Sequence, residues 1–132
     1  MKNFKSVLTL QKLVFDKIEF DRKGFKNTNE LKFELQIQIG VGDDSTHRVT
    51  LVLKGEKQEE YSIAISLSGF FKIEKQEAAD GTDYEMVQQL ISKNAVAIMM
   101  PYLRSELTLL TAQPDTDSVV LPPFNINAML EK

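Results

Sequence analysis

The sequence predicts an α+β fold, in which a four-stranded antiparallel sheet is followed by C-terminal helices packed on one face. Three observations predict it. Four stretches between residues 8 and 73 alternate apolar and polar residues, which is the period of strands with one wet face. After residue 81 the apolar residues recur with the period of helices. Strands and helices are therefore segregated along the chain, which favours α+β over a parallel βαβ sheet.

The second, third and fourth strands have regular patterns, at residues 31–39, 49–53 and 61–73. In the last of them Gly69 occupies an apolar position, which indicates a bulge or a close approach of another segment. Polar connectors at residues 40–45 and 55–59 are expected to be hairpin loops. We expect the four strands to follow one another as sequential hairpins.

The first strand changes phase twice. Its apolar residues fall into three pairs, and each change of phase requires one extra residue. We therefore expect bulges or bends within one long strand. The pairs are Leu8 with Leu10, Leu13 with Phe15, and Ile18 with Phe20.

The helical part begins at a capping box, residues 82–85, and the first helix extends to about residue 91. Asn94 is expected to cap a second helix that ends near Thr111 and is kinked at Pro101. Asn125 is expected to cap a last short helix.

The first half of the second helix is apolar on every side. A helix of this kind must be buried on both sides, and in a small domain only another chain can bury the outer side. We therefore predict a homo-oligomer with this helix at the interface, through Met100, Leu103 and Leu110. A charge at Leu103 or Leu107 should then break the assembly.

Composition limits the class of protein. The 132 residues fit a single domain, residues 1–132, with a net charge of −3 and no cysteine. Seven Lys and Arg residues precede residue 27, but they alternate with apolar residues, so no nucleic-acid partner is expected. The longest apolar run, residues 95–103, is far shorter than the about 18 residues of a membrane span. We expect a cytoplasmic protein without a membrane partner.

The search for catalytic or metal chemistry yields no candidate group. The single histidine, His47, begins a strand that we expect to be exposed, and with Asp43 and Asp44 it matches no established metal site. Glu59 and Glu60 are expected to be solvated in a turn. The sequence thus predicts no enzyme, no metal and no cofactor.

Two C-terminal segments carry a family resemblance. Residues 94–111 contain Asn94, Pro101-Tyr102 and Arg104, and residues 121–130 read Leu-Pro-Pro-Phe-Asn-Ile-Asn-Ala-Met-Leu. Their order and spacing resemble the SecB family of protein-export chaperones, as do residues 8–20 and 68–73. The resemblance implies a tetramer built as a dimer of dimers. It also implies a holdase, a chaperone that binds unfolded polypeptides without ATP and delivers them to the translocase motor ATPase.

A holdase needs accessible and adaptable apolar surface, for which flexible methionines and apolar residues beside Gly, Pro or Asn are suited. A Met or Leu stripe on a helix also fits a plain core, and Phe25 also fits an anchor onto the domain's own core. The candidate client-binding residues are Phe25, Met99, Leu107, Phe124, Ile126, Met129 and Leu130.

One feature departs from the family. Its motor-docking patch is acidic, but here only Asp21 is acidic at a matching place, whereas Lys17, Ser62 and Ala64 occupy the others. Docking to the motor ATPase is therefore not implied. A chaperone of an antitoxin or another dedicated client stays open, as does a non-chaperone adaptor that binds one folded partner.

Overall fold

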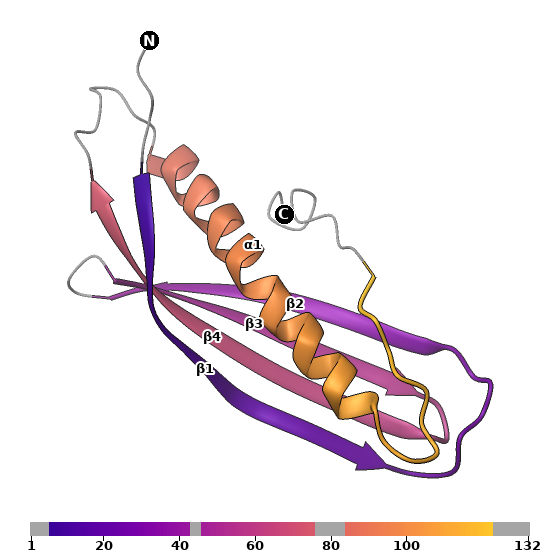
Figure 1. Ribbon diagram of the computed structural model, residues 1–132. Coiled ribbons are helices and arrows are strands. Elements are labelled where there is room, and N and C mark those ends of the chain that lie inside the picture. The colour runs from indigo at the N-terminus through magenta and orange to yellow at the C-terminus, as the bar shows by residue number, and fades with distance from the viewer. Residues whose placement is uncertain (1–5, 43–45, 76–83, 123–132) are drawn as a thin grey trace.

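A computed structural model describes residues 6–42, 46–75 and 84–122 of the chain. These residues form four strands, β1 (Ser6–Arg22), β2 (Leu31–Val41), β3 (Thr46–Lys57) and β4 (Tyr61–Lys75), and one helix, α1 (Tyr84–Thr111). All strand pairs are antiparallel, and α1 crosses one face of the sheet (Figure 1). The predicted α+β class and four-stranded antiparallel sheet are confirmed.

The strand order is β1-β4-β3-β2. β2, β3 and β4 form two hairpins, but β1 pairs with β4, so β1 and β2 are the two edges of the sheet. The expected hairpin between the first two strands is therefore wrong. Residues 23–30, which we call the crossover, instead connect one edge of the sheet to the other across the ends of β3 and β4 (Figure 1).

The predicted irregularities of β1 are confirmed. Its register on β4 shifts between Leu10 and Lys12 and again between Phe15 and Lys17. Each extra residue returns the next apolar pair to the helix-facing side of the sheet, because side chains alternate between faces at every step. Ile18, for example, lies opposite Ile65, whose side chain is in the core.

The loop expected at residues 55–59 is shorter than predicted. β3 continues to Lys57, and the turn comprises Gln58, Glu59 and Glu60. Gly55 lies inside β3 and does not end it. Its missing side chain makes room for the ring of Phe33, two of whose carbons lie 3.2 Å from where a Cβ would be. Glu59 takes the left-handed conformation that this tight turn requires, with a φ of 64°.

The two helices expected on either side of Asn94 are a single helix of 28 residues. Asn94 is exposed on its surface, where its side chain does not compete for the backbone, so the residue neither caps nor interrupts α1. The helix also continues through Pro101. Residues of the expected capping box, Thr82 and Asp83, and the short helix expected from Asn125 lie outside the described residues.

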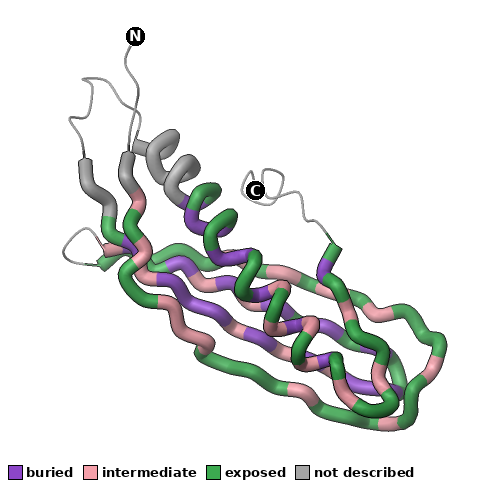
Figure 2. The backbone as a smooth tube through the Cα atoms, viewed as in Figure 1, coloured by how far each residue is buried: buried purple, intermediate pink, exposed green. Residues whose placement is uncertain are grey.

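The core lies between α1 and the sheet, and α1 packs on β1, β3 and β4 (Figure 2). Gly69 is close to the centre of this contact, where a Cβ would lie 2.8 Å from Phe71 and 3.0 Å from the sulfur of Met99. The expected close approach at this glycine is confirmed. None of the described helical residues forms a segment long and apolar enough to cross a membrane. The buried apolar side chains are Val49, Leu51, Leu53, Tyr61, Ile63, Ile65, Leu67, Phe71, Ala95, Val96, Met99, Met100, Leu103, Leu107 and Leu121.

We expect Gly69→Ala to lower the free energy of unfolding by about 1–3 kcal/mol, because the added methyl group must displace the Phe71 ring and the Met99 sulfur. Denaturant unfolding followed by circular dichroism measures the effect. Gly40→Ala is the control, since nothing lies within 4 Å of a Cβ there. Equal stabilities for the two variants would contradict the packing described.

Candidate functional site

The outward side of α1 has three large, exposed apolar side chains. Ile98, Tyr102 and Leu109 are 37%, 49% and 66% exposed, and their spacing places them on one side of the helix. We call these three residues the helix stripe. The opposite side, which includes Val96, Met99, Leu103 and Leu107, faces the sheet and is buried. The helix therefore has apolar residues on both of its sides, as predicted.

A second apolar surface follows β2. Its helix-facing side chains are half-buried over the first eight residues and become exposed toward the end, where Ile39 is 41% and Val41 59% exposed. Within the described residues the row is only partly covered, because α1 makes its main contacts with β1, β3 and β4, and β2 lies at the sheet edge beyond them. We call these side chains the β2 row: Leu31, Phe33, Leu35, Ile37, Ile39 and Val41.

The structure separates the residues predicted to bind clients. Phe25 is 86% exposed, so its alternative role as an anchor onto the core is wrong. Met99 and Leu107 are 0% exposed and pack in the protomer's own core. They cannot contact another chain while α1 stays on the sheet. Phe124, Ile126, Met129 and Leu130 lie outside the described residues.

The residues predicted at the subunit interface also face inward. Met100 is 5% and Leu103 0% exposed, and Leu110 is half-buried against the core. A charge at Leu103 or Leu107 would therefore unfold the protomer rather than simply separate subunits. An interface on the outer side of α1 would instead use the helix stripe.

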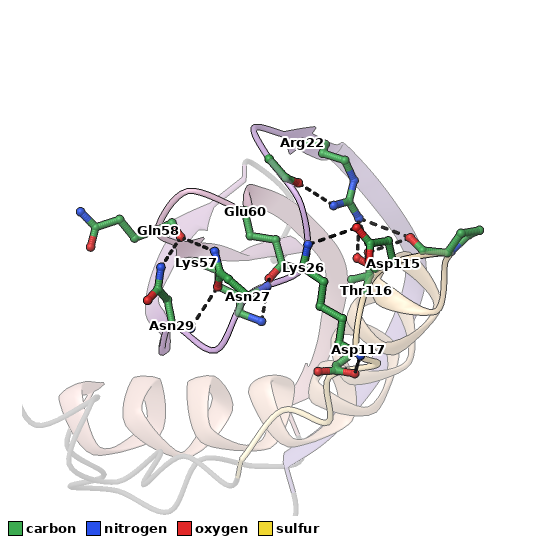
Figure 3. Close-up of polar contacts among 12 residues, drawn as sticks. Arg22, Lys26, Asn27, Asn29, Lys57, Gln58, Glu60, Asp115, Thr116 and Asp117 are labelled. Carbon is green, nitrogen blue, oxygen red and sulfur yellow. Dashed lines mark hydrogen bonds and ion pairs between the residues drawn. The ribbon is translucent and has the colours of Figure 1, made fainter.

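The crossover is fastened at two places (Figure 3). Toward the segment after α1, the Arg22 guanidinium donates to the carbonyl oxygens of Pro114 and Asp115 and to the Thr116 hydroxyl. The Lys26 amide donates to Asp115 Oδ2 at 3.1 Å, and Lys26 Nζ lies 2.8 Å from Asp117 Oδ1. These exposed links join two segments that are about 90 residues apart in sequence.

Toward the β3–β4 turn, the crossover is held by Glu60. The Lys23 and Gly24 amides donate to its carbonyl oxygen at 2.7 and 3.1 Å, and the Asn27 amide donates to its carboxylate Oε1 at 2.9 Å. Lys57 Nζ lies 2.7 Å from the same Oε1. Glu60 is 0% exposed, so the expectation of a solvated carboxylate in this turn is wrong. The crossover covers it, which the local sequence does not reveal.

The ionisation of Glu60 follows from these contacts. Burial raises the pKa of its carboxyl group, but hydrogen bonds from Lys57 and the Asn27 amide, with the charges of Lys57 and Arg22, outweigh burial and lower the pKa below its ordinary value of 4.5. The mutual hydrogen bond of Asp117 and Lys26 lowers the pKa of Asp117 and raises that of Lys26. These carboxylates are therefore charged at neutral pH.

The other face of the sheet is polar. Arg48 NH2 lies 3.3 Å from Asp16 Oδ1, and its guanidinium contacts Ser68 and covers the Phe70 ring at 5.3 Å. Asp16 is the extra residue of the second β1 bulge, which directs it toward this cluster. A shallow groove of about 490 Å³ beside it is lined by residues of all four strands. Because positive and negative groups are paired there, the groove has no single sign of charge.

His47, the single histidine, lies in the core. His47 is 6% exposed, so the expectation of a surface histidine is wrong. Its side chain is on the same face of β3 as that of Val49, toward the helix, and the residue lies opposite Phe71. Among the described residues, no three His, Cys, Asp or Glu side chains gather as a metal site would require. The accessible apolar side chains of the helix stripe and of the end of the β2 row are the features of the described residues that stand out.

Neither the helix stripe nor the burial of Glu60 is among the features predicted from the sequence. The stripe could have been found by its spacing, because residues 98, 102 and 109 lie on one side of the helix and the buried residues 96, 99, 103 and 107 lie on the other. Glu60 had no comparable signal, since its burial depends on a crossover that begins 37 residues earlier.

The four-stranded antiparallel sheet with α1 across one face allows a comparison with solved structures. The chain has the fold of SecB-like chaperones, as the sequence resemblance implied. The SecB-like chaperone Rv1957 of Mycobacterium tuberculosis, solved with a ChAD peptide from the antitoxin HigA1, superposes with a TM-score of 0.62, over 87% of this chain and 86% of that one, at 14% identity. A Streptococcus agalactiae protein of unknown function gives a TM-score of 0.52 at 15% identity, over 89% of this chain and 98% of that one.

In sequence, the chain is similar to an uncharacterized protein of Methanocaldococcus jannaschii, MJ0357. The two are 29% identical over 107 residues, which cover 76% of this chain. The match spans 65% of the length of that relative. No family model matches the chain.

We expect Glu60→Gln to destabilise the protein by about 1–3 kcal/mol at pH 7, because it leaves the buried Lys57 without a counter-charge. The wild-type pKa is lower when folded than when unfolded, so the stabilisation is present above pH 4.5 and is lost as the pH falls through the lowered pKa. Denaturant unfolding of both proteins between pH 7 and pH 3 should show the difference shrinking with acid. The exposed Glu59→Gln is the control, and a difference that is constant with pH would contradict the assignment.

Proposed function

We propose that this protein is an ATP-independent chaperone that holds polypeptide segments in an unfolded state. The observation that carries the proposal is the β2 row, apolar side chains that the protomer's own helix leaves accessible beside its core. The crossover leads into β2 and includes the exposed Phe25, six residues before Leu31 at the start of the row. The row suits an extended chain, and Phe25 supplies an exposed aromatic side chain that the same client can contact.

The energetics agree with a holdase. Covering about 400 Å² of apolar surface is worth on the order of 10 kcal/mol gross, at about 25 cal/mol per Å². Ordering the client offsets much of this gain, so one site binds modestly. Several sites on one oligomer strengthen binding because one client chain can occupy more than one of them. The C-terminal residues Phe124, Ile126, Met129 and Leu130 remain candidates for the same surface.

The oligomer is part of the proposal. The helix stripe is a narrow apolar surface on a rigid helix, and two copies can pack it against itself about a two-fold axis. This arrangement would meet the expectation that another chain covers α1, with Ile98, Tyr102 and Leu109 in place of Met100 and Leu103. We propose a tetramer in the cytoplasm, as the SecB resemblance implies.

A second candidate is a chaperone of one dedicated client, such as an antitoxin. The neighbour in fold, Rv1957, holds a peptide from an antitoxin. The outer face of this sheet also has Lys17, Ser62 and Ala64 where an acidic surface for the translocase motor was expected, and its charged groups are of mixed sign. These features favour a dedicated client over a role in export. A non-chaperone adaptor would use the same surfaces to bind one folded partner.

We expect the protein to suppress the aggregation of unfolded polypeptides without ATP. Reduced, carboxymethylated α-lactalbumin should bind, the disulfide-intact native form should not, and binding should carry a negative heat-capacity change in calorimetry. Phe25→Ala should weaken binding about tenfold, as expected for an exposed aromatic anchor. Gln36→Ala, on the polar face, is the control. Equal binding of folded and unfolded forms would favour the adaptor instead.

We expect the double variant Tyr102→Asp with Leu109→Asp to lower the oligomeric mass, because two copies of the helix stripe would then bring four carboxylates together. Sedimentation equilibrium gives the mass, and circular dichroism checks that the protomer stays folded. Gln36→Asp is the control on the opposite face. A wild-type protein that sediments as a stable monomer would exclude this interface.

A further inference from the structure

Phe25 is an exposed aromatic residue on a loop that is held by hydrogen bonds. Phe25 is 86% exposed, although an apolar ring on a freely moving loop would be expected to fold onto nearby apolar surface. Its neighbours on both sides are held by hydrogen bonds: the amides of Lys23, Gly24, Lys26 and Asn27 all donate. The backbone around Phe25 is therefore ordered while its side chain points to solvent.

Glu60 holds this backbone on both sides of Phe25. Its carbonyl oxygen accepts from Lys23 and Gly24, before the ring, and its carboxylate accepts from Asn27, after it. The contact is too close for a side chain at residue 24, since a Cβ on Gly24 would lie 2.2 Å from the carbonyl oxygen of Glu59. Glycine is thus required where the crossover meets the β3–β4 turn.

The carboxylate of Glu60 is itself fixed. It is 0% exposed, and Lys57, 8% exposed, lies 2.7 Å away. Asn27 and Asn29 also donate from their side-chain amides to the carbonyl oxygen of Gln58, at 3.0 and 2.8 Å (Figure 3). The second half of the crossover therefore lies against a rigid turn, and Glu60 is its only charged partner there among the residues the structure describes.

We propose that Glu60 is the positioning residue for Phe25: its buried carboxylate fixes the crossover so that the ring is ordered before a polypeptide binds. This inference rests on the proposed function and names what prepares the same surface. A ring already held in its bound position loses little freedom on binding, which raises affinity. Glu60 itself contacts no client.

The test uses the absence of tryptophan in the chain. The indole introduced by Phe25→Trp reports on the crossover through its time-resolved anisotropy in the otherwise intact protein. Glu60→Ala is then added to this background, and the affinity for carboxymethylated α-lactalbumin is measured alongside the anisotropy. Two controls accompany it: Glu59→Gln, the exposed neighbour, and Val49→Ala, a core truncation near the other end of β3.

We expect the indole to move with the whole protein in the parent and in both controls, and to gain a fast local motion with Glu60→Ala. Client affinity should fall about three- to tenfold only with Glu60→Ala, the cost of ordering a released side chain and its loop. Val49→Ala separates positioning from stability, since it lowers the stability without touching the crossover.

Three results would overturn the proposal. An indole that is already mobile in the parent would show that the ring is not pre-ordered. An indole that stays immobile with Glu60→Ala would show that Glu60 does not order it, and affinity that is unchanged despite a mobile indole would show that ordering has no effect on binding. If no variant binds the client, the proposed chaperone function fails, and with it the binding half of this inference, whereas the anisotropy still decides whether Glu60 orders the ring.

Discussion

The structure depends on one geometric constraint: the apolar face of a four-stranded sheet is wider than a single helix. α1 covers the central strands and part of β1, and the side chains of Val49, Leu51, Ile65 and Leu67 are excluded from water beneath it. The edge strand β2 receives less cover, so its apolar side chains stay half-exposed. A second layer of helices would complete an ordinary core. With one described helix over the sheet, apolar side chains along the β2 margin stay partly accessible to solvent.

The same constraint explains why the crossover matters. Because β1 and β2 are opposite edges, the chain must pass across the ends of β3 and β4 to reach the uncovered strand. A connection of this length without secondary structure needs local contacts to hold it, and the buried Glu60 and the segment after α1 supply them. The links to Asp115 and Asp117 are exposed and individually weak in water, whereas those to Glu60 are shielded from it.

Much of this fold could be predicted from local sequence, because side-chain period reports which face a residue occupies. The two phase changes of β1 specified its bulges, and the same rule applied to His47, in phase with Val49, would have indicated burial. The strand order could not be derived this way, since the pairing of β1 with β4 joins residues far apart in sequence. The apolar composition of α1 indicated two buried sides but not which residues faced the sheet, so Met100 and Leu103 were assigned to the wrong side. The burial of Glu60 depends on the crossover and has no local signal.

The two bulges of β1 have a consequence for growth of the sheet from copy to copy. β2 pairs with β3 without a register shift and presents an even outer edge, whereas the register of β1 is broken at two places. Head-to-tail stacking, with β2 of one molecule against β1 of the next, would extend a sheet without limit and produce a fibre. The two bulges interrupt the even spacing of backbone donors and acceptors along β1, which disfavours this pairing relative to one between two even edges. Bulges on an edge strand are one means by which sheet proteins limit edge-to-edge association of their copies.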